Sequence, residues 1–122
     1  MLKSQSLLNK VLTMEVKLES FDNWQVIKVC GQIDSKTVGD LRDFIDTELN
    51  QTQPVALELT EVPFMSSAGL RTLLTLQRKT VDMGVELALV GVSTEIADTM
   101  KVTGFYQFFK VYETLENLHG GS

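Results

Sequence analysis

Two adjacent serines, Ser66 and Ser67, are the side chains in this sequence whose type and position best suit chemistry. They come a few residues after an apolar, strand-like stretch and directly before Ala68 and Gly69, where a helix is expected to begin. The first N–H groups of a helix have no partner inside it, and the helix dipole places partial positive charge there, so a phosphate on a serine is well accommodated. The pair therefore predicts either a helix cap or a phosphorylation site.

The same segment lacks the residues that would make it catalytic. It contains neither the Gly-x-x-x-x-Gly-Lys pattern of a phosphate-binding loop nor the Gly-x-Ser-x-Gly turn of a hydrolase. The chain has one histidine, His119, close to its last residue, which is a poor position for the base of a Ser-His-Asp triad. One histidine and one distant cysteine, Cys30, do not make a metal site. We therefore expect a protein that is not an enzyme and holds no metal or other cofactor.

Composition and charge describe an acidic, globular chain. The 122 residues carry a net charge of −5, with 43% apolar and 22% charged residues, which suits one ordinary domain. The 11 lysines and arginines are scattered, so the sequence offers little of the phosphate neutralisation that nucleic-acid binding requires. No apolar run approaches the roughly 20 residues of a membrane span, and residues 1–13 lack the apolar stretch of a secretory signal. The expectation is a cytoplasmic protein with no membrane span and no nucleic-acid partner.

Hydrophobic periodicity predicts strands that alternate with helices. Apolar and polar residues alternate over 14–20, and the turn residues Asp22 and Asn23 separate this stretch from a second strand. The predicted strands cover residues 14–20, 24–30, 55–59, 85–90 and 108–112, and the predicted helices cover about 35–49, 67–84, 93–104 and 114–118. The order β-β-α-β-α-β-α-β-α implies a hairpin followed by parallel crossovers. We predict one α/β domain over 14–118, a mixed, mostly parallel sheet flanked by helices, with an N-terminal extension at 1–13 and a flexible tail at 119–122.

Single residues carry further predictions about caps and packing. Asp34 and Ser35 are good N-cap residues for the first helix, and Ser93 is one for the third. Gly84 suits the position just after the second helix. The aromatic and sulfur-bearing side chains expected to pack inside the protein are those of Trp24, Cys30, Phe64, Met65, Phe105, Tyr106, Phe108 and Phe109.

Three segments of the sequence match the motifs of one known family. Residues 65–70 read Met-Ser-Ser-Ala-Gly-Leu, residues 31–34 read Gly-Gln-Ile-Asp, and residues 102–105 read Val-Thr-Gly-Phe ahead of the last strand. They resemble the Asp-Ser-Ser-Gly-Leu, Gly-Glu-Leu-Asp and Leu-x-Gly-Leu segments of the STAS domain family, as found in bacterial anti-sigma factor antagonists. The resemblance covers roughly residues 14–118, with the motifs in the family's order and at its spacing.

The resemblance implies a partner switch controlled by a phosphate. The family's phosphoacceptor serine maps onto Ser67, and the acidic residue before it maps onto Ser66, a departure that makes Ser66 a lesser candidate for the acceptor. In the family, the unphosphorylated protein binds an anti-sigma factor, usually a histidine-kinase-like ATPase that is also a serine kinase. Phosphorylation releases the antagonist, and a serine phosphatase restores binding. Ala68 and Gly69 are expected to leave room for the partner. The residues expected to contact the partner are Asp34, Ser35, Ser66, Ser67, Ala68, Gly69 and Arg71.

The sequence leaves two other functional roles of a STAS domain open. A STAS domain without a phosphoswitch serves as a subunit of a lipid (ABC) transport complex or as a regulatory piece of an anion transporter, and some STAS domains sense nucleotides. The lack of a membrane segment disfavours the anion transporter, and the lack of a phosphate loop disfavours nucleotide binding. The serine at the acceptor position favours the phosphoswitch.

Overall fold

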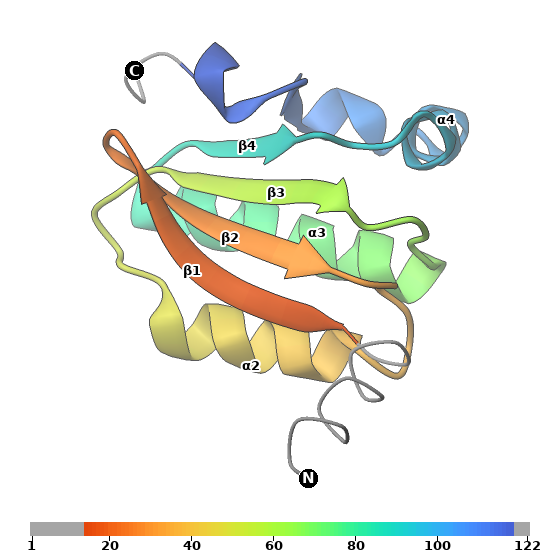
Figure 1. Ribbon diagram of the computed structural model, residues 1–122, viewed down its shortest axis with the longest axis horizontal. Coiled ribbons are helices and arrows are strands. Elements are labelled where there is room, and N and C mark those ends of the chain that lie inside the picture. Colours follow the sequence, from red (N-terminus) through yellow and green to blue (C-terminus); the bar gives the residue numbers. More distant parts are fainter. Residues whose placement is uncertain (1–13, 119–122) are drawn as a thin grey trace, which may run out of the picture.

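The computed structural model of the chain describes residues 14–118, which form a five-stranded sheet with helices packed on it (Figure 1). The extension expected at 1–13 and the tail expected at 119–122 lie outside the described residues. The strands are β1 (Glu15–Phe21), β2 (Trp24–Cys30), β3 (Val55–Glu61), β4 (Leu87–Val90) and β5 (Lys110–Tyr112). The helices are α2 (Val38–Glu48), α3 (Ser67–Met83) and α4 (Thr94–Thr103), joined by the short 3-10 turns η1 (Tyr106–Phe108) and η2 (Leu115–Asn117).

The strands lie in the sheet in the order in which the chain forms them, β1-β2-β3-β4-β5. β1 and β2 are antiparallel, and Phe21 pairs with Trp24 across a tight turn in which Asp22 takes a left-handed φ of 52°. The pairs β2–β3, β3–β4 and β4–β5 are parallel, and a helix lies in each crossover. The predicted hairpin and the mixed, mostly parallel sheet are therefore confirmed.

The main core lies between one face of the sheet and the helices. Ile27, Leu57 and Leu89, from three neighbouring strands, are fully buried in the same cluster as Leu73 of α3 and Met100 of α4. Apolar stripes on α2 and α3 cover this face, and Figure 1 shows the two helices on the same side of the sheet. This packing fixes α3 along the sheet and thereby places its first turn.

A smaller cluster forms on the opposite face of the sheet. Trp24, Val26, Ala56 and Val90 are buried there together with Leu118, which follows η2. Trp24 is only 3% exposed, so the interpretation of this aromatic as a packing residue is confirmed. The last described turn of the chain therefore helps to close this face, whose buried cluster contains no residue of the α-helices found in 14–118.

The first helix begins later than the sequence predicted. Asp34 and Ser35 do not cap it, because α2 starts at Val38 after Thr37. The carboxylate of Asp34 accepts hydrogen bonds from the N–H groups of Lys36 and Thr37 at 2.9 and 3.2 Å. These short-range bonds hold residues 35–37 in a turn, because an aspartate side chain offers the backbone an alternative to the helical pattern.

The C-terminal part departs from the prediction in two ways. The strand predicted over 108–112 is shortened to β5, because residues 106–108 form the turn η1. The helix predicted over 114–118 is the single turn η2. Phe108 was expected in the core and is 51% exposed, because it lies in η1 and not in the strand. Cys30, expected inside, is only half-buried at the end of β2.

The predicted ends of the other two helices are confirmed. The hydroxyl of Ser93 accepts a hydrogen bond from the N–H group of Ile96 at 3.2 Å and caps α4. Gly84 ends α3 with a left-handed φ of 74°, a conformation that glycine adopts without steric cost. Over residues 14–118, none of the helices is both long enough and apolar enough to cross a bilayer.

Candidate functional site

The loops that follow β2 and β3 are hydrogen-bonded to each other at the edge of the sheet where α2 and α3 both begin (Figure 1). Ile33 and Met65 form an isolated parallel bridge beyond the two strands. The N–H group of Ile33 donates to the carbonyl of Phe64 at 3.0 Å, and the N–H group of Ser66 donates to the carbonyl of Ile33 at 2.8 Å. The bridge therefore brings the Asp34 segment beside the two serines.

The loop before α2 is stiffened by Thr37, which sequence reasoning missed. Its buried hydroxyl donates to the carbonyl of Gln32 at 3.0 Å and accepts from the N–H group of Asp34 at 2.9 Å. The Asp34 carboxylate is occupied in the same turn, whereas Ser35 is exposed. The spacing Asp-x-x-Thr is the signal that could have indicated this closed turn. Asp34 thus acts first as a structural residue, whereas the exposed side chain of Ser35 forms no hydrogen bond with residues 14–118.

Gly69 lies against the bridged loops and faces the interior of the protein. A Cβ atom placed on it would lie 2.9 Å from Cγ2 of Ile33, 3.1 Å from the carbonyl oxygen of Ile33 and 2.5 Å from Cγ of Met65. The interpretation that Gly69 leaves room for a partner is therefore wrong, because the room is taken by the protein's own loop. Ala68, one position before Gly69, is half-buried and lines a groove together with Val38 and Arg42 of α2.

The two adjacent serines have different roles in the structure. Ser66 is the N-cap of α3: its backbone is extended, and its hydroxyl accepts a hydrogen bond from the N–H group of Gly69 at 3.4 Å. Ser67 is the first helical residue and is exposed, and its hydroxyl makes no hydrogen bond to any residue of 14–118. The chemistry that the sequence assigned to the pair therefore divides, with Ser66 stabilising the helix start and Ser67 presenting a free hydroxyl.

The electrostatic surroundings of Ser67 suit a phosphate. The N–H groups of Ser67 and Ala68 have no acceptor among the described residues, and the first turn of α3 contains no acidic side chain. Arg71, exposed on the same helix, follows Ser67 by four positions and so shares its face. Unpaired donors, the positive end of the helix dipole and a nearby guanidinium all favour a doubly negative group at this position.

The surface beside the serines includes an apolar side chain that was expected to be buried. Met65 is 6% exposed and anchors the loop as predicted, but Phe64 is 49% exposed. Phe64 points outward because the backbone of residues 64–66 is held in the extended bridge, which sends neighbouring side chains to opposite sides. It borders a hollow of about 440 Å³ toward α4, where Ile96 forms an apolar base and Glu95 and Asp98 are acidic.

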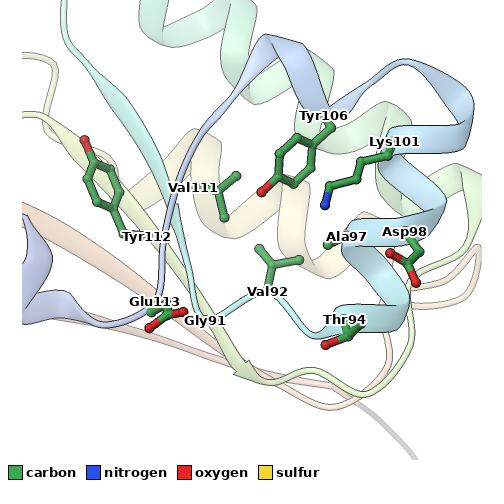
Figure 2. Close-up of a pocket in the computed structure, with 10 residues that line it drawn as sticks. All are labelled: Gly91, Val92, Thr94, Ala97, Asp98, Lys101, Tyr106, Val111, Tyr112 and Glu113. Atoms are coloured by element: carbon green, nitrogen blue, oxygen red, sulfur yellow. The ribbon is translucent and has the colours of Figure 1, made fainter.

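A larger hollow of about 530 Å³ lies at the ends of β4 and β5 (Figure 2). Its basic side chain, Lys101, is held with Nζ 4.9 Å from the centre of the Tyr106 ring. Asp98 and Glu113 give the lining two acidic groups against this one lysine. Such a charge balance disfavours the phosphates of a nucleotide, so this hollow adds no support for nucleotide sensing.

One shifted pKa among the described residues lies at the opposite edge of the sheet. Lys110, at the start of β5, donates a hydrogen bond to the Glu86 carboxylate at 2.8 Å, and this bond raises the pKa of Lys110. The amino group is already protonated at neutral pH, so the shift does not change its charge there. Because β3 and β5 run in the same direction, the ion pair lies far from Ser67 and does not contribute to its chemistry.

The fold and this helix start define the class of protein. The family model of the STAS domain matches residues 15–118, nearly all of the described chain, and the chain belongs to the STAS domain family. The resemblance inferred from the three sequence segments is therefore confirmed.

Particular relatives are anti-sigma factor antagonists. The chain is 26% identical to the anti-sigma-B factor antagonist of Staphylococcus aureus over 107 residues, which cover 86% of this chain and 98% of that protein. It resembles the crystal structure of an anti-sigma factor antagonist from Mycobacterium paratuberculosis with a TM-score of 0.76 and 24% identity, over 86% and 90% of the two chains. It also resembles unphosphorylated SpoIIAA, an anti-sigma factor antagonist of Bacillus, with a TM-score of 0.69 and 20% identity, over 84% and 91% of the chains. These solved structures share the fold described above.

The close packing of Gly69 leads to a prediction with an internal control. Gly69→Ala should lower the free energy of unfolding by about 1–3 kcal/mol, because the added methyl group overpacks the contact with Ile33. Gly39→Ala in α2 meets no atom within 4 Å and should raise it by about 0.5–1 kcal/mol through helix propensity. Urea unfolding of both variants measures the two signs. A Gly69→Ala protein as stable as the wild type would show that the bridged loops do not require glycine here.

The division of roles between the serines leads to a second prediction. Ser66→Ala should destabilise the protein by about 0.5–1 kcal/mol, because the N–H group of Gly69 loses its cap. Ser67→Ala should change the stability by less than about 0.5 kcal/mol, because the exposed hydroxyl has no partner to lose. Thermal and urea unfolding test this order, and a larger loss in Ser67→Ala would contradict the assignment of Ser66 as the cap.

Proposed function

We propose that this chain is an anti-sigma factor antagonist that works as a phosphorylation-controlled partner switch. In its unphosphorylated form it binds an anti-sigma factor that is also a serine kinase of the histidine-kinase-like ATPase type. Phosphorylation of Ser67 releases it, and a serine phosphatase restores binding. The observation that carries the proposal is the exposed, unbonded hydroxyl of Ser67 at the start of α3. In this scheme the chain is the substrate of a kinase and of a phosphatase and not itself an enzyme.

The structure of the helix start favours Ser67 over Ser66 as the acceptor. A kinase must bring the hydroxyl oxygen in line with the γ-phosphate of ATP, which a solvent-exposed side chain permits. The Ser66 hydroxyl is half-buried and engaged by the N–H group of Gly69, so its phosphorylation would break the cap. Ser66 therefore stays the lesser candidate.

A phosphate on Ser67 should act on docking and leave the fold intact. It adds a charge of about −1.5 to −2 at neutral pH, and a helix N-terminus with unpaired N–H groups tolerates that charge. A partner that packs against the same residues meets extra bulk and extra negative charge. A 100-fold loss of affinity corresponds to only about 2.7 kcal/mol, which one interfacial phosphate can supply.

The surface proposed for partner binding surrounds Ser67. Ser35 is exposed on the loop bridged to it, and Arg71 lies one turn into the helix on the same face. Asp34, Ser66 and Ala68 are half-buried at the rim, and Gly69 lies beneath them. In this proposal Gly69 supports the surface from below, while the other residues supply contacts. The relatives named as anti-sigma factor antagonists support the choice of partner.

Mass spectrometry after incubation with a kinase tests the acceptor. The wild-type protein and the Ser67→Ala, Ser66→Ala and Ser20→Ala variants would be incubated with ATP and each histidine-kinase-like serine kinase of the host. We expect one added phosphate of about 80 Da on the wild type, on Ser66→Ala and on Ser20→Ala, and none on Ser67→Ala. Ser20→Ala is the matched control, because Ser20 is an exposed serine on β1, outside the surface proposed for partner binding.

The possible results separate the mechanism from its site. Loss of the phosphate only in Ser66→Ala would keep the mechanism and move the acceptor by one residue. If a kinase that binds the wild-type protein phosphorylates neither serine, the phosphoswitch is wrong.

A further inference from the structure

A groove between α2 and α3 begins directly beside Ser67. It has a volume of about 440 Å³ and is lined by Val38, Arg42, Ala68, Arg71, Thr72 and Thr75. Ala68 belongs to the first turn of α3, so the groove is continuous with the proposed acceptor site. Both helices begin at the same edge of the sheet (Figure 1), and the lining residues place the groove between the N-terminal parts of the two helices.

The charges in this groove are unusual for so acidic a chain. Arg42 from α2 and Arg71 from α3 are exposed, and neither forms an ion pair or a hydrogen bond through its guanidinium group with residues 14–118. Further along the same seam, Asp46 of α2 pairs with Lys79 of α3 at 3.4 Å. Asp46 lies one turn after Arg42 on α2 but pairs with Lys79, so Arg42 and Arg71 are two cations without an ion-pair partner among residues 14–118, in a protein whose net charge is −5.

We infer that this groove docks an acidic segment of the partner protein, with carboxylates held by Arg42 and Arg71; the inference rests on the proposed function. Two guanidinium groups that face one groove repel each other until an anion lies between them. Their planar forks bind carboxylates in a bidentate manner, which gives orientation as well as affinity. Val38 and the threonine methyl groups supply a short apolar floor for the same segment.

The position of Arg71 couples this docking site to the phosphate. Arg71 follows Ser67 by four residues, so a phosphate on Ser67 lies on the same helix face within reach of the guanidinium. No acidic side chain stands one turn before or after Arg71 on that face, because those positions hold Ser67 and Thr75. Phosphorylation therefore creates an internal anion that competes with the partner's carboxylate for Arg71. Release then follows from the loss of a binding residue, in addition to bulk and repulsion.

Binding measurements with arginine variants test the docking site. The chain has three arginines, and the third, Arg78, is exposed on α3 but lies outside the groove, which makes Arg78→Gln a matched control. The affinity of the unphosphorylated protein for its purified anti-sigma kinase would be measured by calorimetry. We expect Arg71→Gln and Arg42→Gln to weaken binding by about tenfold or more each, and Arg78→Gln by less than about twofold. Melting temperatures of the free variants check that each one folds.

An NMR experiment that needs no partner tests the competition. Phosphoserine would be incorporated at position 67 during synthesis, and the Nε–Hε resonances of the three arginines would be compared with those of the unmodified chain. We expect the Arg71 resonance to shift and its hydrogen exchange with water to slow, while that of Arg78 stays in place. An Arg71 resonance that does not respond to the phosphate would overturn the internal competition.

The binding results distinguish this inference from the proposed function. If the kinase binds the wild type and both groove variants equally well, the docking site is wrong while the partner switch stands. If no kinase of this type binds the wild-type chain, the proposed function fails, and the docking site falls with it. If the groove variants alone lose affinity, both are supported.

Discussion

The contact on which the rest of the site depends is the bridge between the loops that follow β2 and β3. Ile33 and Met65 extend the parallel sheet by one pair beyond the ends of their strands. The bridge brings α3 so close to these loops that a side chain at position 69 would force Ile33 or Met65 to shift, and it holds Ser66 in the extended backbone of a cap. Ser67 then lies on the outside, because successive helical residues are turned by about 100°. A packing constraint beneath the helix thus sets the position of the free hydroxyl.

The fold and part of the site could be predicted wherever a local pattern agrees with the final surroundings. β2 spans the predicted residues because its apolar run is bounded by a tight turn and by Gly31, whose φ is 108°. α3 begins and α4 is capped where serines precede apolar helical stripes, and both helices end at left-handed glycines. The exposure of Ser67 at a helix start follows from the same local signals. Where local preference and tertiary structure agree in this way, the fold can be predicted from the sequence.

The remaining features depend on contacts between segments that are distant in the sequence. The space beside Gly69 faces Ile33 and not a partner, which only the loop bridge reveals. Aspartate is a residue type that often caps helices, but the carboxylate of Asp34 instead accepts a hydrogen bond from the N–H group of Thr37 and closes a turn. Arg42 and Arg71 line one groove only because α2 packs beside α3. In the sequence, each is an ordinary charge on a solvated helix. In these cases the sequence shows which residue types are present, but the packing of loops and helices determines what each side chain contacts.

The central claim of this account is that a phosphate on Ser67 changes what the protein binds and leaves its fold unchanged. The most direct test compares the unmodified chain with a chain carrying phosphoserine at position 67, using calorimetry against the same purified anti-sigma kinase and a thermal melt of each protein. The account predicts that the phosphate weakens binding by about 100-fold or more, a change of about 2.7 kcal/mol, while the melting temperature stays within a few degrees. Equal affinity of the two forms, or an unfolded phosphorylated chain, would contradict it.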